Sequence, residues 1–356
     1  MAITKWAWAL LGIVSLIIRW VASKFPEWAE QYYSRGFFLF IRQLVDKTLG
    51  NLPFPSVFLF ILLLGFLFLF FIRKLTRIPK GKPRWFFGIR SLLNFSGALV
   101  FFFLTLWGFN YQRIPIIQQL GLQVQPLNLE ELKKEINYSH EQLISIRQQL
   151  QTDTSAIEEI VDYSVLERNV RENLFHNLGL LDLKYSGNPR TRMFPPPGFM
   201  RKMGILGIYF PFTGESYIDP TLHPLEQPFT VAHEMAHSFG VTDEGEANFV
   251  AWVIGTHSSD PLLEYTAYLR LFLYQVRDYY RMDPEGYQGW IENLDRGILN
   301  DIRSIQERNA QYPPFSIELS RKTNDLFLKS QGVKAGVMSY QELPMLVYAW
   351  KQKFEG

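Results

Sequence analysis

The chain has 356 residues, a formal net charge of +2 and no cysteine. A charge this close to neutral argues against a nucleic-acid-binding protein, which would concentrate basic residues on one face. The absence of cysteine excludes disulfides, a cysteine nucleophile and a thiolate zinc site. Hydrophobic residues make up 47% of the chain and are concentrated towards its N-terminal end.

Three largely apolar runs, at about 6–22, 54–72 and 92–110, each approach the roughly 20 residues that cross a hydrocarbon core. The middle run carries no charge, and the first carries only Arg19, near its end. A signal peptide is a poor description of the first run, because no clear cleavage site is present and two further runs follow it. The sequence therefore predicts a membrane anchor of three transmembrane helices within residues 1–111.

The loop between the second and third runs is strongly basic and contains no acidic residue. Its cations are Arg73, Lys74, Arg77, Lys80, Lys82, Arg84 and Arg90. Such loops remain on the cytoplasmic side and can also bind anionic lipids. We therefore expect a protein of the bacterial cytoplasmic (inner) membrane, with a cytoplasmic N-terminus and an exocytoplasmic chain after Tyr111.

A tether at 112–127 leads into a predicted α-rich domain at 128–356. Asn128 and Glu131 form a capping-box signature at the start of an amphipathic helix, 128–151. Further along, the patterns predict a helix at 155–178, a polyproline-like loop at 186–198 and a β-hairpin formed by 205–210 and 216–219. The hairpin either binds an extended substrate by strand addition or is purely structural.

The stretch His233-Glu234-Met235-Ala236-His237 carries the clearest chemical signal. Residues i and i+4 of a helix share one face, so both imidazoles can reach one ion. Glu234 lies beside that face as a general base, which completes the H-E-x-x-H pattern of zinc hydrolases. Gly240 ends this helix, and a second helix opens near Asp243.

The third metal ligand has two candidates. Glu246 on the second helix gives a two-His-plus-Glu site, and we prefer it. Asp243 completes H-E-x-x-H-x-x-G-x-x-D instead. Each has a structural alternative, since Asp243 can be the N-cap of the second helix with Glu246 as its capping-box partner. We expect Glu244 only to favour the helix dipole. The donors also suit Fe or Mn, but the helical motif favours Zn²⁺.

The run from Pro228 to His237, followed by Glu244-Gly245-Glu246-Ala247-Asn248-Phe249, resembles a family of uncharacterised bacterial membrane proteins known as a domain of unknown function. More distantly, the two motif helices are similar to gluzincin metallopeptidases. That resemblance implies a third ligand on the following helix, which we assign to Glu246. Asn248 stands where membrane-bound gluzincins have an Asp that supports a ligand.

Together these features predict a mainly α protein with a zincin-like domain and a small β-hairpin beside the H-E-x-x-H helix. We expect a membrane-anchored zinc metallopeptidase that hydrolyses peptides or proteins of the cell envelope. His233, His237 and Glu246 would hold Zn²⁺, Glu234 would be the base, and His257 or a Tyr or Arg of the following helix would stabilise the oxyanion.

Two other classes remain open. The protein is a non-catalytic scaffold if the metal is structural or the site is that of a pseudo-enzyme. A transporter is less consistent with the sequence, because the predicted spans contain no acidic residue.

Overall fold

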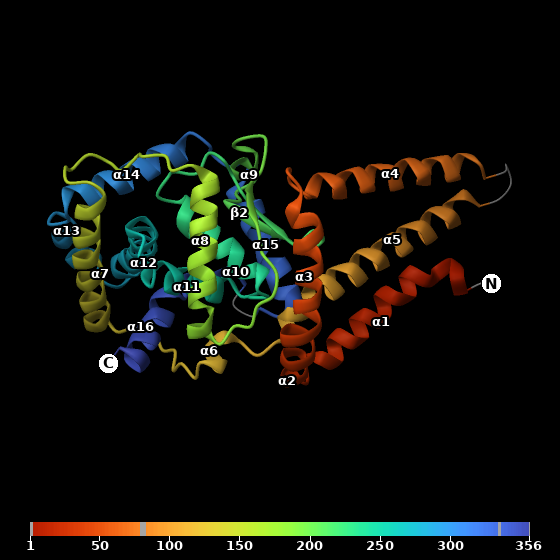
Figure 1. The fold of residues 1–356 in the computed structure, drawn as a ribbon, viewed down its shortest axis with the longest axis horizontal. Coiled ribbons are helices and arrows are strands. Elements are labelled where there is room, and N and C mark those ends of the chain that lie inside the picture. The colour runs from red at the N-terminus through yellow and green to blue at the C-terminus, as the bar shows by residue number, and fades with distance from the viewer. Residues whose placement is uncertain (1–2, 79–82, 334–335, 356) are drawn as a thin grey trace. The chain divides into compact units, whose positions relative to one another are not determined.

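The computed structural model describes residues 3–78, 83–333 and 336–355, and the protein is mainly helical, with 70% helix (Figure 1). The chain forms two compact units. Unit 1 comprises Met1–Ile114, Tyr185–Pro189 and Phe210–Glu215, and unit 2 comprises Pro115–Lys184, Arg190–Tyr209 and Ser216–Gly356. The predicted mainly α class is confirmed, whereas the return of two later segments to unit 1 was not foreseen.

Unit 1 contains the apolar helices. Its elements are α1 (Ala7–Ala22), α2 (Pro26–Trp28), a π-helix (Ala29–Phe37), α3 (Phe38–Thr48), α4 (Val57–Thr76) and α5 (Arg84–Leu106), with 3₁₀ turns at Ile3–Trp6, Leu49–Asn51 and Gly108–Gln112. Helix α4 has 20 residues and α5 has 23, and both are long and apolar enough to cross a membrane. Outward-facing side chains such as Leu62 and Leu69, each 68% exposed, suit a lipid environment.

The predicted first span, 6–22, is supported only as part of a longer, bent segment. Helix α1 has 16 residues, fewer than the roughly 20 that a span requires. It qualifies only together with Pro26–Asn51, from which it is bent by 113°. The described chain therefore has two candidate spans, or three if this bent pair counts as one. Lys80 and Lys82 of the predicted basic loop lie outside the described residues.

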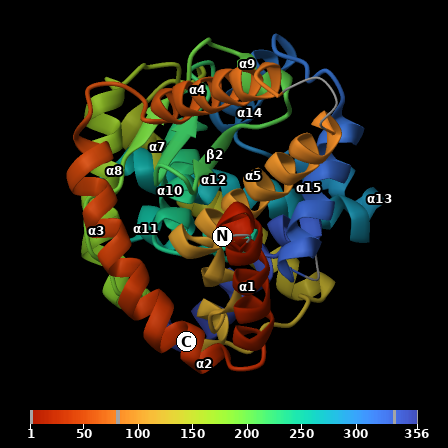
Figure 2. The ribbon, with the colours of Figure 1, turned by 90° about the vertical axis from the view of Figure 1, so that its right-hand side faces the viewer.

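Helices α1 and α5 lie side by side (Figures 1 and 2). A Cβ atom added at Gly12 would lie 2.6 Å from the Gly97 Cα atom, and one added at Gly97 would overlap the Trp8 carbonyl oxygen. Close contact between small residues is how membrane helices pack tightly. Asn94 strengthens the pair, because its amide donates to the Lys5 carbonyl at 3.0 Å and accepts from the Ala9 amide at 3.3 Å.

Buried polar contacts attach the two later segments to unit 1. The Arg42 guanidinium donates to the Gly214 carbonyl at 2.7 Å, and Asp46 accepts from the Asn188 amide at 2.7 Å. Arg42 and Asp46 also pair with each other at 2.5 Å within α3. One helix therefore binds both segments through a charged pair.

Unit 2 carries the remaining elements. The helices are α6 (Ile116–Gln119), α7 (Leu129–Leu150), α8 (Tyr163–Asn177), α9 (Phe199–Lys202), α10 (Gln227–Ser238), α11 (Glu244–Thr256), α12 (Pro261–Met282), α13 (Pro284–Ile291), α14 (Arg296–Ala310), α15 (Ile317–Gln331) and α16 (Leu343–Phe354), with 3₁₀ turns at Leu178–Leu181 and Gly336–Gln341. The strands are β1 (Thr191–Met193), β2 (Gly207–Phe210) and β3 (Glu215–Ile218).

The hairpin prediction is confirmed, but the sheet has a third strand. Its order is β1-β3-β2, with β1 parallel to β3 and Thr191 opposite Ser216. The Ser216 hydroxyl donates to the Glu234 carbonyl at 2.8 Å, so the sheet lies beside α10. Strand β1 lies inside the loop predicted at 186–198, because three residues pair with β3 before the prolines begin.

The start of the second amphipathic helix also differs from the prediction. Helix α8 begins at Tyr163 and not at 155, since the Asp162 carboxylate accepts from the Ser164 and Val165 amides at 2.9 and 3.2 Å. The segment before α8 is not helical near Asp153. Its backbone is bound by Arg147 of α7, which donates a hydrogen bond to the Asp153 carbonyl at 2.6 Å. The capping box at Asn128 is present as predicted.

The core of unit 2 is built around α10 and α11, which contact each other and are packed by α8 and α12. A buried polar junction joins three surrounding helices. Asp301 of α14 is fully buried and accepts from Arg147 of α7 at 2.9 Å and from the Tyr265 hydroxyl of α12 at 2.5 Å. Because breaking such a junction leaves a buried charge unpaired, it fixes these helices rigidly.

The glycine contact of unit 1 gives a testable prediction. Gly97→Ala should lower the melting temperature of the purified full-length protein, because the added methyl group overpacks the α1–α5 crossing at a cost of about 1–3 kcal/mol. Gly88→Ala on the same helix is the control, since a Cβ at Gly88 meets no atom within 4 Å. Equal melting temperatures for the two variants would contradict the close contact of α1 and α5 at Gly97.

Candidate metal centre

The two motif histidines lie on α10, and the turn after this helix brings α11 back against it. Gly240 adopts a positive φ of 80°, which allows the chain to leave the helix. Asp243 then caps α11, accepting from the Gly245 and Glu246 amides at 2.8 and 3.0 Å. This short connection places the first turn of α11 opposite the last two turns of α10.

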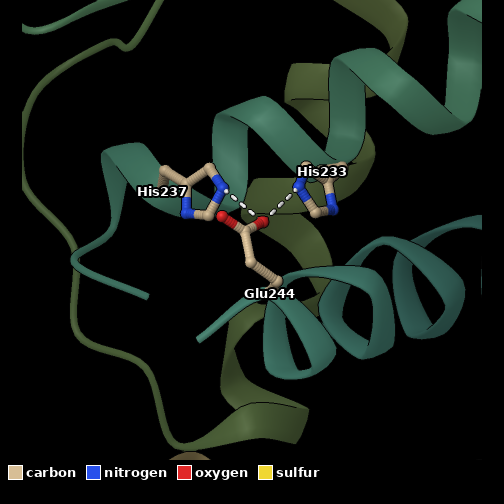
Figure 3. Close-up of side chains that lie close together, drawn as sticks. All are labelled: His233, His237 and Glu244. Atoms are coloured by element: carbon tan, nitrogen blue, oxygen red, sulfur yellow. Dashed lines mark hydrogen bonds and ion pairs between the residues drawn. The ribbon is translucent and has the colours of Figure 1, made fainter. Parts of the chain in front are cut away.

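Three potential metal-ligand atoms lie close together between α10 and the first turn of α11 (Figure 3). The Glu244 Oε2 atom lies 3.1 Å from Nε2 of His233 and 3.4 Å from Nε2 of His237. Within the described chain, these residues form a group of potential metal ligands whose atoms all lie within 4.8 Å of one another. The His233 and His237 residues are 8% and 7% exposed, and the Glu244 side chain is 12% exposed.

The outer nitrogen of each imidazole is held by an acceptor. Nδ1 of His233 lies 2.9 Å from Oδ1 of Asn248, and Nδ1 of His237 lies 2.8 Å from the Val241 carbonyl oxygen. Both oxygens can only accept a hydrogen bond, so each Nδ1 atom carries the proton. In a neutral ring, Nε2 then has a free lone pair. Two nitrogen lone pairs and a carboxylate oxygen therefore converge, an arrangement that requires added protons or a cation.

The pKa values of the three residues are shifted by their close approach and by burial. Burial alone would lower the pKa of His237, but the Glu244 carboxylate raises it to about 9. Burial likewise opposes ionisation of Glu244, yet the histidines, His237 foremost, hold its pKa well below its usual range. Burial dominates at His233 and lowers its pKa. A divalent cation would satisfy all three donors without added protons.

The donors fit zinc. Ligands about 2.0–2.1 Å from a tetrahedral zinc ion lie about 3.3 Å apart, close to the separations of 3.1 and 3.4 Å between Glu244 and the two histidines. Imidazole nitrogens and a carboxylate are common zinc ligands, and the contacts to Asn248 and Val241 orient the imidazoles from behind.

Glu234 lies beside this group in an unusual environment. Its carboxyl group is buried, and no hydrogen-bond partner reaches its Oε2 atom in the described part of the chain. Gly207, the first residue of β2, makes room for it, since a Cβ there would lie 2.5 Å from Oε1. Burial raises the pKa of Glu234 to about 8, and His237 lowers it less than burial raises it.

Comparison with known proteins identifies the family. Residues 33–348 match the family described as protein of unknown function (DUF3810). The chain belongs to this family. No curated protein and no solved structure matches the chain. The predicted resemblance to a family of unknown function is thus confirmed, and the likeness to gluzincins remains a hypothesis about the site.

In this DUF3810 protein, Glu244 takes the position that we had assigned to Glu246. Successive helical residues are about 100° apart, so Glu244 and Glu246 point about 200° apart and cannot both face α10. The Glu246 carboxylate accepts from the Ile117 amide at 3.1 Å. Glu244 and Asn248, at i and i+4, share the face towards the histidines, and this spacing was the signal in the sequence that could have identified Glu244.

The two other candidates also lie elsewhere. The Asp243 carboxylate caps α11, the structural alternative that we had left open for it. His257 follows the C-terminal end of α11, about 20 Å along the helix from Glu244. Its Nδ1 atom lies 2.9 Å from the Val253 carbonyl oxygen, and its ring packs against Trp350. His257 therefore lies at the end of α11 away from the donor group, and its role in stabilising the oxyanion stays a prediction.

Asn248 provides a test of how the imidazoles are oriented. Asn248→Ala should weaken zinc binding by about 10–100-fold, because His233 loses the acceptor that fixes its tautomer. Asn248→Asp retains an acceptor at the same position and should keep or increase the affinity. Competition with a fluorescent zinc chelator measures both, and unchanged affinity in Asn248→Ala would contradict this role.

Proposed function

We propose that the protein is a membrane-anchored zinc-dependent peptidase whose ligands are His233, His237 and Glu244 and whose general base is Glu234. The observation that carries the proposal is the buried Glu234 carboxyl group, whose Oε2 atom has no partner among the described residues. Burying such a group costs free energy and has no evident structural benefit. Its position beside a three-donor cluster supports a chemical role.

The division of labour follows from the residues. A bound Zn²⁺ would polarise the scissile carbonyl and increase the acidity of the attacking water. Glu234 accepts the proton of that water and passes it to the leaving amine. A pKa raised to about 8 suits a group that must both take up and release a proton near neutral pH.

The number of protein donors favours a catalytic over a structural metal. Structural zinc sites are closed by four protein ligands, whereas catalytic sites have three and an open position. Three donors form the group in the described chain. A scaffold with a structural metal also gives no reason for the buried carboxyl group of Glu234, so we place this alternative second.

The sheet offers a place for the substrate. The strand order β1-β3-β2 leaves one side of β2 at the edge of the sheet, and β2 begins at Gly207, against the Glu234 carboxylate. An extended peptide that adds to an edge strand forms main-chain hydrogen bonds along it. A peptide bound to β2 would pass beside Glu234, which supports a peptide as the substrate.

The side of the membrane follows from the basic loop after α4. If this loop is cytoplasmic, α5 returns the chain to the opposite side, whether or not α1 spans the membrane. Unit 2 would then be exocytoplasmic in a bacterial inner membrane. The substrates we propose are peptides or proteins of the cell envelope.

Glu234→Gln separates the catalytic from the structural role. The variant should keep its zinc, while hydrolysis of a pool of internally quenched peptides should fall by about 10²–10⁴-fold because the proton acceptor is lost. Chelation should abolish wild-type hydrolysis, and added zinc should restore it. Wild-type rates in Glu234→Gln would exclude this residue as the base and favour a contaminating peptidase.

A further inference from the structure

Two arginines and a tyrosine form a cationic stripe on one face of α12. Arg270, Tyr274 and Arg277 are spaced i, i+4 and i+7, so they share that face. The Arg270 and Arg277 guanidinium carbons lie 5.3 and 4.9 Å from the centre of the Tyr274 ring, one on each side along the helix. This cationic stripe therefore presents two guanidinium groups around one aromatic ring.

The guanidinium groups of the stripe are only partly hydrogen-bonded by neighbouring side chains. The Nε atoms of both arginines are buried without a hydrogen-bond partner among the described residues. The Arg270 guanidinium packs against the rings of Phe229 and Tyr274, and Arg277 forms an ion pair with the Asp278 carboxylate at 3.5 Å. Contacts with rings offset only part of the cost of removing a guanidinium from water. The stripe therefore retains two buried N–H donors that form no hydrogen bond among the described residues.

The stripe lies next to the metal centre. The Arg270 guanidinium carbon is 5.7 Å from the centre of the Phe229 ring on α10. Phe229 precedes His233 by four residues, about 6 Å along the helix, and shares its face. An anion at Arg270 would therefore lie about one helical turn from the ligands.

We propose that Arg270, supported by Arg277, binds a carboxylate of the substrate, so that the enzyme selects peptides with an acidic group near the scissile bond. This inference rests on the proposed peptidase function, because the anions of unmodified peptides are carboxylates. A guanidinium matches a carboxylate through two parallel hydrogen bonds, a geometry that lysine cannot reproduce. The carboxylate belongs either to an Asp or Glu side chain or to the C-terminus of the peptide.

The test uses the full-length, zinc-loaded protein and matched neutral and acidic peptides. One set moves a single Asp, or its Asn counterpart, along a peptide with blocked ends, and a second pair has a free or an amidated C-terminus. The proteins compared are the wild type, Arg270→Gln, Arg270→Lys and Arg277→Gln. Arg281→Gln is the matched control, because it removes the same charge from α12 at a side chain that is 55% exposed.

We expect wild type and Arg281→Gln to cleave one acidic peptide at least about tenfold more efficiently, by kcat/KM, than its neutral counterpart. Arg270→Gln should reduce this preference to less than about twofold, and Arg270→Lys should retain part of it. If the Asp and Asn peptides differ, Arg270 binds a side-chain carboxylate. If the peptides with a free and an amidated end differ, it binds the C-terminal carboxylate. Equal preference in Arg270→Gln and wild type, or no preference in wild type, would overturn the subsite.

Binding separates failure of the subsite from failure of the peptidase proposal. The same peptides, fluorescently labelled, are titrated against zinc-loaded Glu234→Gln with and without Arg270→Gln. If no peptide is hydrolysed by wild type, the peptidase proposal fails. Tighter binding of an acidic peptide that disappears with Arg270→Gln would still support the anion subsite, and binding indifferent to charge would overturn it.

Discussion

Three hydrogen-bond acceptors converge between α10 and α11, and this convergence is the constraint on which the rest of unit 2 depends. The Nε2 atoms of His233 and His237 lie 3.1 and 3.4 Å from Oε2 of Glu244, in a position that is nearly free of solvent. Acceptors repel one another unless a proton or a cation lies between them. Asn248 and Val241 fix the orientation of the two imidazole rings, because each accepts a hydrogen bond from one Nδ1 atom.

The surrounding fold keeps these donors in place. Asp301 joins α7, α12 and α14 through buried hydrogen bonds, and the sheet is attached to α10 through Ser216. That attachment brings Gly207 against Glu234, where a Cβ atom would lie 2.5 Å from Oε1 of the carboxyl group. Rigid elements are what a site needs if its groups are to be held in a reactive geometry. The stripe proposed to bind an anion lies on α12, which also packs against α10.

Local features of the chain were predictable. The capping box at Asn128, the H-E-x-x-H helix, its end at Gly240 and the hairpin all depend on residues close in sequence. The choice between Glu244 and Glu246 depended on where α11 begins, since the cap at Asp243 sets which carboxylate faces α10. Strand β1, the Gly207 contact with Glu234 and the end-of-helix position of His257 depend on long-range packing, which periodicity does not reveal. The bend after α1 was likewise not predictable, because the apolar run at 6–22 gives no information on the direction of the chain that follows it.

The most direct measurement is the zinc content of the full-length protein, prepared with excess zinc and then dialysed, for wild type and four variants. We predict about one zinc per chain in wild type, Glu246→Gln and Asp243→Asn, and loss of zinc in His233→Ala and Glu244→Gln. Zinc retained in Glu244→Gln but lost in Glu246→Gln would contradict the assignment of the third ligand. A wild-type protein without zinc would contradict the metal centre itself.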